Sequence, residues 1–193
     1  MLRRRLQMAG NGGNWEPCTY ITNDNGGYIT FDLHSYFSIE IEVENFENII
    51  GENIMGGNNA NVHISENNKV ALRGNEINVL LQDITKIKWG HWSGVSAKNT
   101  NCIVNNTGTS AIASTNTIVN FTADLYKVHG TAGTSNFKIK KLTLENSGEK
   151  NIYLPYRCIN AYDNYILNEG AFICVDNGEI IASSTLNKLV ANG

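Results

Sequence analysis

Three glutamates alternate with aliphatic residues between Glu40 and Glu44, and their spacing suits acid–base chemistry. A period of two places Glu40, Glu42 and Glu44 on one face of a β-strand, with successive carboxylates about 6–7 Å apart. Retaining glycosidases need two carboxyl groups about 5–5.5 Å apart, one of them with a raised pKa. A glycoside hydrolase that uses Glu40 and Glu44 is therefore one hypothesis, and cation binding is another. A solvated strand face that discourages edge-to-edge aggregation explains the same pattern, and we expect no enzyme.

Two tryptophans and a histidine lie close together between Lys88 and Gly94. Indole rings are flat and largely apolar, so they can stack on the apolar faces of sugars. The sequence therefore predicts a glycan-binding site formed by Trp89, His91 and Trp92. The alternative is a core tryptophan followed by a turn.

The remaining reactive residues do not form a recognisable centre. The cysteines Cys18, Cys102, Cys158 and Cys174 are far apart and include no C-x-x-C pair, so we expect no metal site and mostly buried free thiols, with disulfides as the alternative. No serine or cysteine lies in a nucleophile context, and no glycine-rich phosphate loop leads from a strand into a helix. We therefore expect no cofactor.

Short apolar segments separated by Asn- and Gly-rich turns predict an all-β fold. No segment keeps a helical period, although residues 183–190 are compatible with one short helical turn. Many short strands at regular spacing favour a two-sheet antiparallel jelly-roll sandwich. We expect strands at residues 19–21, 28–33, 37–43, 51–55, 62–64, 70–72, 77–81, 85–89, 103–104, 111–113, 118–126, 172–175 and 179–182.

The clearest strand pair runs from Phe137 to Cys158. Its apolar residues alternate, the phase slips by one residue at Lys140–Lys141, and this slip predicts a β-bulge. The turn is expected at Asn146-Ser147-Gly148. On this alignment one set of side chains should face the core: Leu142, Leu144, Ile152 and Leu154.

Composition limits the classes of function. A chain of 193 residues with 41% hydrophobic residues fits one domain with a real core. The net charge is -3, and because Arg3, Arg4 and Arg5 precede the fold, the body is more acidic still. Nothing resembles a basic nucleic-acid stripe, and no apolar run is long enough for a secretion signal or a membrane span. We expect no nucleic-acid partner and no membrane association.

Residues 1–14 form a separate segment, with a basic start followed by a Gly- and Asn-rich run, and residues 15–193 form the sandwich domain. Such a run is typical of a flexible arm. The arm is either a disordered tail or a tether that orders on a partner. As a tether it would make contacts through Leu2, Arg3, Arg4, Arg5, Leu6 and Met8.

Three segments, in order, resemble the concanavalin A-like (laminin-G-type) jelly-roll domains of phage and prophage structural proteins. They are Tyr20–Phe31, Phe137–Arg157 and Gly170–Ile181, each a strand pair around a polar or Asn-Gly turn. The basic start is similar to that of small proteins from phages of gut Bacteroidetes. Glu40–Glu44 also resembles the Glu-x-Asp-x-Glu strand of glucanases that share this sandwich, with Glu42 in place of the aspartate. Residues 45–135 depart from the pattern.

The resemblance implies a bacteriophage virion accessory protein, either a capsid decoration or a head or tail fibre module, assembled in the host cytoplasm. Its arm would bind other virion proteins, and its outward face would adhere to host-surface or mucosal glycans. A homo-oligomer is expected. The alternative is a stand-alone carbohydrate-binding lectin module, followed by the glycoside hydrolase.

Overall fold

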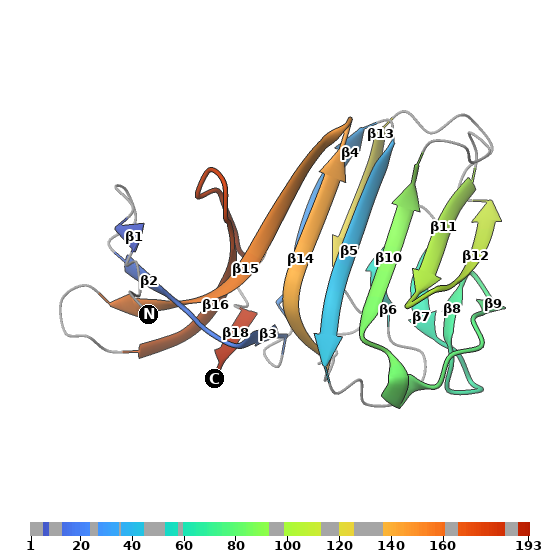
Figure 1. The fold of residues 1–193 in the computed structure, drawn as a ribbon, viewed down its shortest axis with the longest axis horizontal. Coiled ribbons are helices and arrows are strands. Elements are labelled where there is room, and N and C mark those ends of the chain that lie inside the picture. The colour runs from blue at the N-terminus through green and yellow to red at the C-terminus, as the bar shows by residue number, and fades with distance from the viewer. Residues whose placement is uncertain are drawn as a thin grey trace.

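The computed structural model describes residues 6–7, 13–23, 27–34, 36–44, 53–57, 60–92, 99–112, 120–125, 137–160, 166–183 and 189–193. Among these residues the only helical element is one 3₁₀ turn, η1 (Leu81–Asp83), and every other element is a strand. The all-β class predicted from the sequence is confirmed. Figure 1 shows the strands arranged as two packed layers that continue into a smaller group of strands at one end.

The larger sheet has 12 strands in the order β1-β2-β15-β16-β18-β3-β14-β5-β10-β11-β12, with β17 paired to β16. Its strands are β1 (Leu6–Gln7), β2 (Gly13–Pro17), β3 (Tyr20–Thr22), β5 (Phe37–Glu44), β10 (Lys86–His91), β11 (Asn99–Val104), β12 (Thr107–Ile112), β14 (Lys138–Asn146), β15 (Glu149–Asn160), β16 (Ile166–Cys174), β17 (Ile180–Ile181) and β18 (Leu189–Asn192).

The smaller sheet has 6 strands in the order β4-β13-β6-β7-β8-β9. Its strands are β4 (Ile29–His34), β6 (Asn53–Gly56), β7 (Val62–Ile64), β8 (Val70–Leu72), β9 (Asn75–Glu76) and β13 (Asn120–Leu125). In Figure 1 this sheet lies behind β14, β5, β10, β11 and β12. The two layers enclose the main hydrophobic core.

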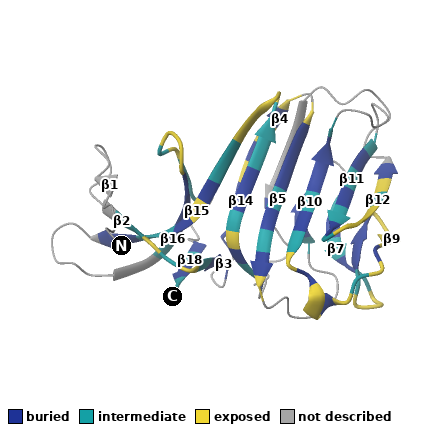
Figure 2. Ribbon diagram, viewed as in Figure 1, coloured by how far each residue is buried: buried dark blue, intermediate teal, exposed yellow. Residues whose placement is uncertain are grey.

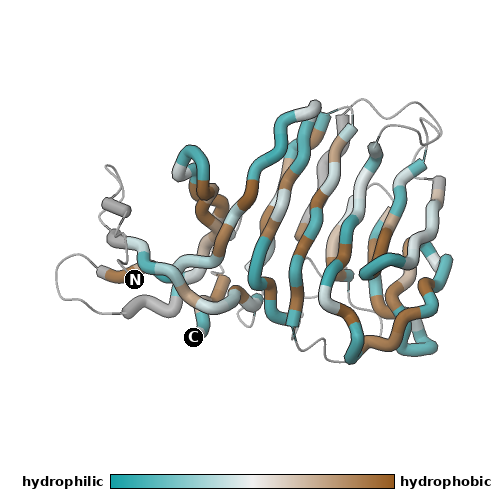
Figure 3. The backbone as a smooth tube through the Cα atoms, in the orientation of Figure 1, coloured by the Kyte–Doolittle hydropathy of each residue, from teal (hydrophilic) through white to brown (hydrophobic). Residues whose placement is uncertain are grey.

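Period-two alternation explains how each layer contributes to that core. In β4 the buried positions are Ile29, Phe31 and Leu33, with exposed residues between them. In β5 the inward residues Ile39 and Ile41 are fully buried, while the glutamates that alternate with them are not. Figures 2 and 3 show the same alternation of buried, apolar positions with polar ones along the long strands. Burial of one apolar face on each sheet is what holds the layers together.

Beyond the two layers, part of the larger sheet closes on itself. Strand β14 pairs with β15, β15 with β16, β16 with β18, β18 with β3, and β3 again with β14, so 5 strands form a closed ring. Small barrels are filled by side chains. Here Ile21, Ile139 and Leu189 are fully buried and belong to the continuous core. Gly170 leaves room for this filling, because a Cβ atom there would lie 2.5 Å from Cδ1 of Ile21.

The predicted hairpin is present, with its bulge, but one of its faces was assigned wrongly. The register of β14 against β5 shifts between Ile139 and Lys141, as the sequence indicated. The turn, however, contains only Ser147 and Gly148, because Asn146 pairs with Glu149.

This shorter turn pairs Leu142 with Tyr153, so Tyr153 faces the core and is 1% exposed. The predicted core residues Ile152 and Leu154 point away from it: Leu154 is 38% exposed and Ile152 is half-buried. A one-residue change in turn length reverses the faces of a whole strand.

Three boundaries also differ from the sequence-based expectation. Residues 77–80 are not a strand; they lead into the 3₁₀ turn η1. Leu189 and Val190 belong to strand β18 rather than to a helical turn, and residues 184–188 lie outside the described residues. Strand β2 begins at Gly13, and Leu6–Gln7 pairs with Trp15 and Asn14, so strand structure extends into the segment assigned to the arm.

Candidate functional site

The side of the larger sheet that faces away from the smaller sheet carries the candidate chemistry. We call the solvent side of β14, β5, β10, β11 and β12 the outer face. Cross-strand pairing arranges its residues in rows, and one row joins Thr143, Glu40, Lys88 and Ile103. Glu40, Glu42 and Glu44, the residues of the hydrolase hypothesis, therefore lie among lysines of the neighbouring strands.

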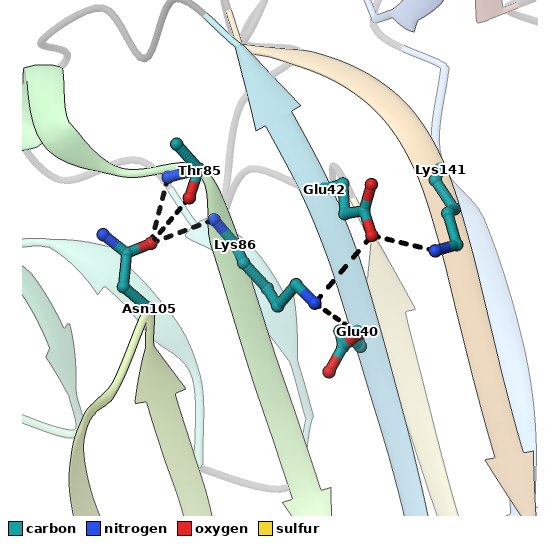
Figure 4. Close-up of polar contacts among 6 residues, drawn as sticks. All are labelled: Glu40, Glu42, Thr85, Lys86, Asn105 and Lys141. Atoms are coloured by element: carbon teal, nitrogen blue, oxygen red, sulfur yellow. Dashed lines mark hydrogen bonds and ion pairs between the residues drawn. The ribbon is translucent and has the colours of Figure 1, made fainter.

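Each of these glutamates has a lysine partner (Figure 4 shows the contacts of Glu40 and Glu42). Lys86 Nζ lies 3.3 Å from a Glu40 carboxylate oxygen and 3.8 Å from one of Glu42. Lys141 Nζ donates to Glu42 at 2.9 Å, and Lys140 Nζ lies 2.7 Å from Glu44. The carboxylates thus form an ion-pair network with β10 and β14.

The ion pair between Glu44 and Lys140 has an electrostatic effect that opposes acid catalysis by Glu44. The hydrogen bond from Lys140, followed by its positive charge, holds the pKa of Glu44 below its usual value. The general acid of a glycosidase needs a raised pKa instead. Glu44 is also exposed to solvent, and its slight desolvation raises its pKa less than Lys140 lowers it. The arrangement suits a stable sheet surface better than a pair of catalytic carboxyl groups.

The corner before β10 is fixed by one asparagine. The Oδ1 atom of Asn105 accepts hydrogen bonds from the backbone N–H groups of Thr85 and Lys86, at 3.0 Å and 3.1 Å, and from the Thr85 hydroxyl (Figure 4). Its Nδ2 donates to the carbonyl of Asp83 at 2.8 Å. These bonds set where β10 starts, and they therefore position Lys86 beside Glu40 and Glu42.

The structure separates the residues of the predicted glycan site. Trp89 faces the core, is 0% exposed, and packs against Phe37 with ring centroids 5.4 Å apart. It has no exposed indole face on which a sugar could stack. This position corresponds to the alternative given above, a core tryptophan in a strand.

His91 is also buried, at 3% exposed. Its Nδ1 lies 2.7 Å from the carbonyl oxygen of Asn99, and because a carbonyl only accepts, Nδ1 carries the proton. The imidazole is stacked on Tyr36, with centroids 5.5 Å apart and planes 5° from parallel. Tyr36 is 54% exposed and has a positive φ of 62°, so it covers His91 from the solvent side. His91 is thus held as a packing residue beneath Tyr36.

Trp92 is the member of the predicted trio that is half-buried rather than buried. The ammonium group of Lys88 lies over its ring, 5.1 Å from the centroid. This contact places the indole on the outer face together with Lys88. An indole that meets solvent beside a cation is suited to stacking and to electrostatic recognition.

The sequence did not single out the residues around Trp92. Gly90 lies between Lys88 and Trp92 and pairs with Ser38 on one side and Asn101 on the other. Part of this group was predictable from the sequence: alternation along β10 puts Lys88 and Gly90 on one face, and alternation along β5 puts Ser38 on the face of the glutamates. The contribution of Asn101 depends on the register of β10 with β11, which short polar strands do not reveal.

The other predicted residues give no second site. The four cysteines are free thiols, and three of them are buried. Burial raises the pKa of Cys18 to about 11 and that of Cys102 to about 12, so neither is a ready nucleophile. Within the described ranges, no group of three or more His, Cys, Asp or Glu residues is placed to hold a metal ion, and no helix has the length and apolar character needed to cross a membrane.

The predicted anchoring residues lie mostly outside the described part of the chain. Leu2, Arg3, Arg4, Arg5 and Met8 are outside it, and Leu6 is placed by its backbone in β1. Strand β1 pairs with β2, and β2 pairs with β15, which is a strand of the ring. Any contact made by the start of the chain therefore begins beside the ring.

Comparison of the chain with protein-family models, with curated proteins and with solved structures finds no match in any of the three. Function is therefore inferred from the sequence and from the geometry described above.

Proposed function

We propose that the chain is a non-enzymatic binding module of a bacteriophage virion, a capsid decoration or a head or tail fibre module with a concanavalin A-like jelly-roll sandwich. Its N-terminal arm binds other virion proteins, and its outer face adheres to host-surface or mucosal glycans around Trp92. The module is assembled in the host cytoplasm and acts as a homo-oligomer without a cofactor.

One observation carries the proposal of binding rather than catalysis. On the outer face, each carboxylate of the strand Glu40–Glu44 is paired with a lysine, whereas the indole of Trp92 is half-buried and its neighbouring cation is Lys88. A carboxylate that a lysine holds ionised, as Lys140 holds Glu44, is a poor general acid, while an accessible aromatic ring next to polar groups is a common feature of binding sites.

The distribution of the family-like segments supports a division between scaffold and recognition. The segments Tyr20–Phe31, Phe137–Arg157 and Gly170–Ile181 contain all or part of β3, β14, β15 and β16, which are strands of the ring. They also contain β17 and the first half of β4. The chain between them supplies β10, β11 and β12 and most of the smaller sheet. On this proposal the ring is the scaffold, and Trp92 lies in residues 45–135, where the sequence departs from the resemblance.

The alternative is a stand-alone lectin module, which would bind the same glycan without any virion partner. The presence of the chain in purified virions of the phage that encodes it distinguishes the two functions. Quantitative mass spectrometry of gradient-purified particles should find the chain at a fixed ratio to the major capsid protein. Its absence from particles, together with glycan binding by the free protein, would favour the lectin.

Anchoring is tested with a triple variant, Arg3→Gln, Arg4→Gln and Arg5→Gln, which leaves β1 and β2 in place. We expect this variant to fold normally and to be depleted from virions by about tenfold. A matched variant, Lys69→Gln, changes charge on the smaller sheet and should be incorporated normally. Normal incorporation of the triple variant would contradict anchoring through the arm.

The hydrolase hypothesis is tested with a laminarin-type polymer. The proposal predicts no release of reducing sugar by the wild-type chain. Hydrolysis that disappears in Glu40→Gln would overturn the non-enzymatic assignment.

A further inference from the structure

Four side chains surround Gly90 on the outer face. Cross-strand pairing puts Ser38 of β5 on one side of it and Asn101 of β11 on the other. Lys88 precedes it by two residues in β10 and is on the same face. Trp92 comes directly after the end of β10, and the ammonium group of Lys88 lies over its ring, 5.1 Å from the centroid. Diagonal neighbours in an antiparallel sheet are about 7–8 Å apart, which is within reach of a lysine or an indole. Lys88, Trp92 and Asn101 therefore converge around a position that has no side chain.

The glycine at this position is required by the backbone. A Cβ atom on Gly90 would lie 2.2 Å from the carbonyl oxygen of Phe37 and 2.6 Å from the Cα of Ser38. These are backbone atoms, which cannot move aside as the end of a flexible side chain can. The bare position between Lys88 and Trp92 is thus a fixed feature of the sheet.

Lys88 differs from the other lysines around the carboxylates. Lys86, Lys140 and Lys141 are all within ion-pair distance of a glutamate. The cross-strand neighbour of Lys88 is Glu40, whose carboxylate is instead 3.3 Å from Lys86. Within the described part of the chain, the recorded partner of the Lys88 ammonium is the ring of Trp92, 5.1 Å away, and no carboxylate lies within ion-pair distance of it.

Asn101 has an unused donor at the same place. Its Nδ2 is buried and has no hydrogen-bond acceptor among the residues that the structure describes. Buried amide groups in folded proteins are nearly always bonded, and an exception calls for an explanation. A bound ligand that supplies the acceptor is one such explanation.

We propose that this site, formed by Lys88, Trp92 and Asn101 around Gly90, binds an anionic saccharide that carries a carboxylate or a sulfate. The hydroxyl of Ser38 at the edge of the site already donates to a carboxylate oxygen of Glu145 at 3.3 Å, so it is not counted among the ligand contacts. The inference rests on the proposed function and specifies its ligand. The sugar stacks on the indole, its anionic group pairs with Lys88, and an oxygen of the ligand accepts from Asn101 Nδ2.

The charge of the ligand follows from the contact between Lys88 and Trp92. A sugar that stacks on the indole displaces the ammonium group from the ring and removes its cation–π contact. A neutral sugar leaves that ammonium without a charged partner. An anionic group replaces the lost contact with a charge-assisted hydrogen bond, which is stronger than a neutral one. The site therefore favours an acidic saccharide over a neutral one of the same shape.

The test uses the full chain and three probes of similar size: a galacturonic acid trimer, a neutral galactose trimer and a sulfated galactose trimer. Calorimetric titration should show the anionic trimers binding about fivefold more tightly than the neutral one, as expected for one exposed ion pair. The advantage should shrink at high salt. Lys88→Gln should abolish it, whereas Lys88→Arg, and Lys69→Gln on the smaller sheet, should retain it.

The outcomes are distinct. Lys88-dependent preference for either anionic trimer supports the inference and identifies the group as carboxylate or sulfate. Equal affinity for all three trimers, dependent on Trp92 but unchanged in Lys88→Gln, would overturn the inference and leave the proposed function standing. Failure of every saccharide to bind would overturn both. Circular dichroism of each variant confirms that a lost interaction is not a loss of fold.

Discussion

At the scale of single residues, the chemistry of each side chain on the outer face depends on its neighbours. Glu40, Glu42 and Glu44 were attractive as catalysts because of their spacing alone. In the folded chain these glutamates are paired with lysines of β10 and β14, and those strands are distant from β5 in the sequence. The alternation could be predicted, but the pairing partners could not, because they depend on strand order and on the bulge in β14.

The tryptophans illustrate the same limit. Trp89 and Trp92 are three residues apart, and two strand residues separated by an odd number of positions point to opposite faces of a sheet. The sequence could therefore have predicted that only one of them is accessible. Which of the two faces the core follows from the buried neighbours Ile87 and Phe37, since Ile87 is on the same face as Trp89.

The close backbone approach at Gly90 leads to a direct prediction. Gly90→Ala should lower the free energy of unfolding by about 3 kcal/mol, because the added methyl group meets backbone atoms of β5. Gly74→Ala is the matched control: Gly74 has a positive φ of 84° but nothing within 4 Å of an added Cβ. Its loss should be about 1 kcal/mol. Urea denaturation measures both, and equal losses would contradict the packing at Gly90.

The pairing of Glu44 with Lys140 predicts a pH dependence. A carboxyl group whose pKa is lower in the folded than in the unfolded state stabilises the fold above its unfolded pKa, and this contribution is lost as the pH falls through the folded pKa. For Glu44 the loss should occur in acid, below the reference value of 4.5. NMR titration of its carboxyl carbon should give a midpoint below that value in the wild type.

Lys140→Gln should move the Glu44 midpoint back towards the reference value. Glu76 provides an internal control, since its pKa is lowered chiefly by the hydroxyl of Ser65 and should not respond to the Lys140 change. An unchanged Glu44 midpoint in Lys140→Gln would show that the ion pair does not form in solution.

At the scale of elements, the hairpin of β14 and β15 connects the two parts of the molecule. One strand pair belongs both to the two-layered part and to the ring, since β14 also pairs with β5 and with β3. Its existence, its bulge and the position of its turn were predictable from period-two alternation and turn residues. The inward faces were not, because they depend on whether the turn has two or three residues.

The turn itself gives a test. Ser147 has a φ of 53° and Gly148 one of 87°, the left-handed pair that a two-residue hairpin needs. Ser147→Asn should raise the free energy of unfolding by about 0.5 kcal/mol, because Asn-Gly favours this turn. Ser147→Val should lower it by about 1–2 kcal/mol, because a branched side chain opposes a positive φ. Urea denaturation measures both free energies of unfolding. Equal changes in Ser147→Asn and Ser147→Val would contradict a two-residue turn with a positive φ at Ser147.

At the scale of the whole molecule, the ring and the proposed binding site around Trp92 lie at different ends. The first and last strands, β1 and β18, lie at the ring end, and β10, β11 and β12 lie at the other (Figure 1). The sequence predicted an all-β domain with two layers of strands. It did not predict the ring, since its closure requires β3 and β18, which are short and come from opposite ends of the chain, to pair with each other.

This arrangement supports the proposed adhesion module, because it separates the start of the chain from the outer face. A partner bound through the start of the chain would hold the ring end, and the outer face around Trp92 would remain accessible. The continuous core, which includes Ile21 and Leu189 of the ring as well as Leu72 of the smaller sheet, joins the two ends into one packed unit. Attachment at one end can therefore present the other in a defined orientation.

Glycan-array binding by wild-type protein and by Trp92→Ala tests the central claim most directly. The wild type should bind a defined set of glycans, and Trp92→Ala should lose them while its melting temperature stays within about 2 °C, since the indole is not part of the core. Leu80→Ala, which removes another exposed apolar side chain, should bind as the wild type does. Unchanged glycan binding by Trp92→Ala, or a lower melting temperature with binding intact, would contradict the account.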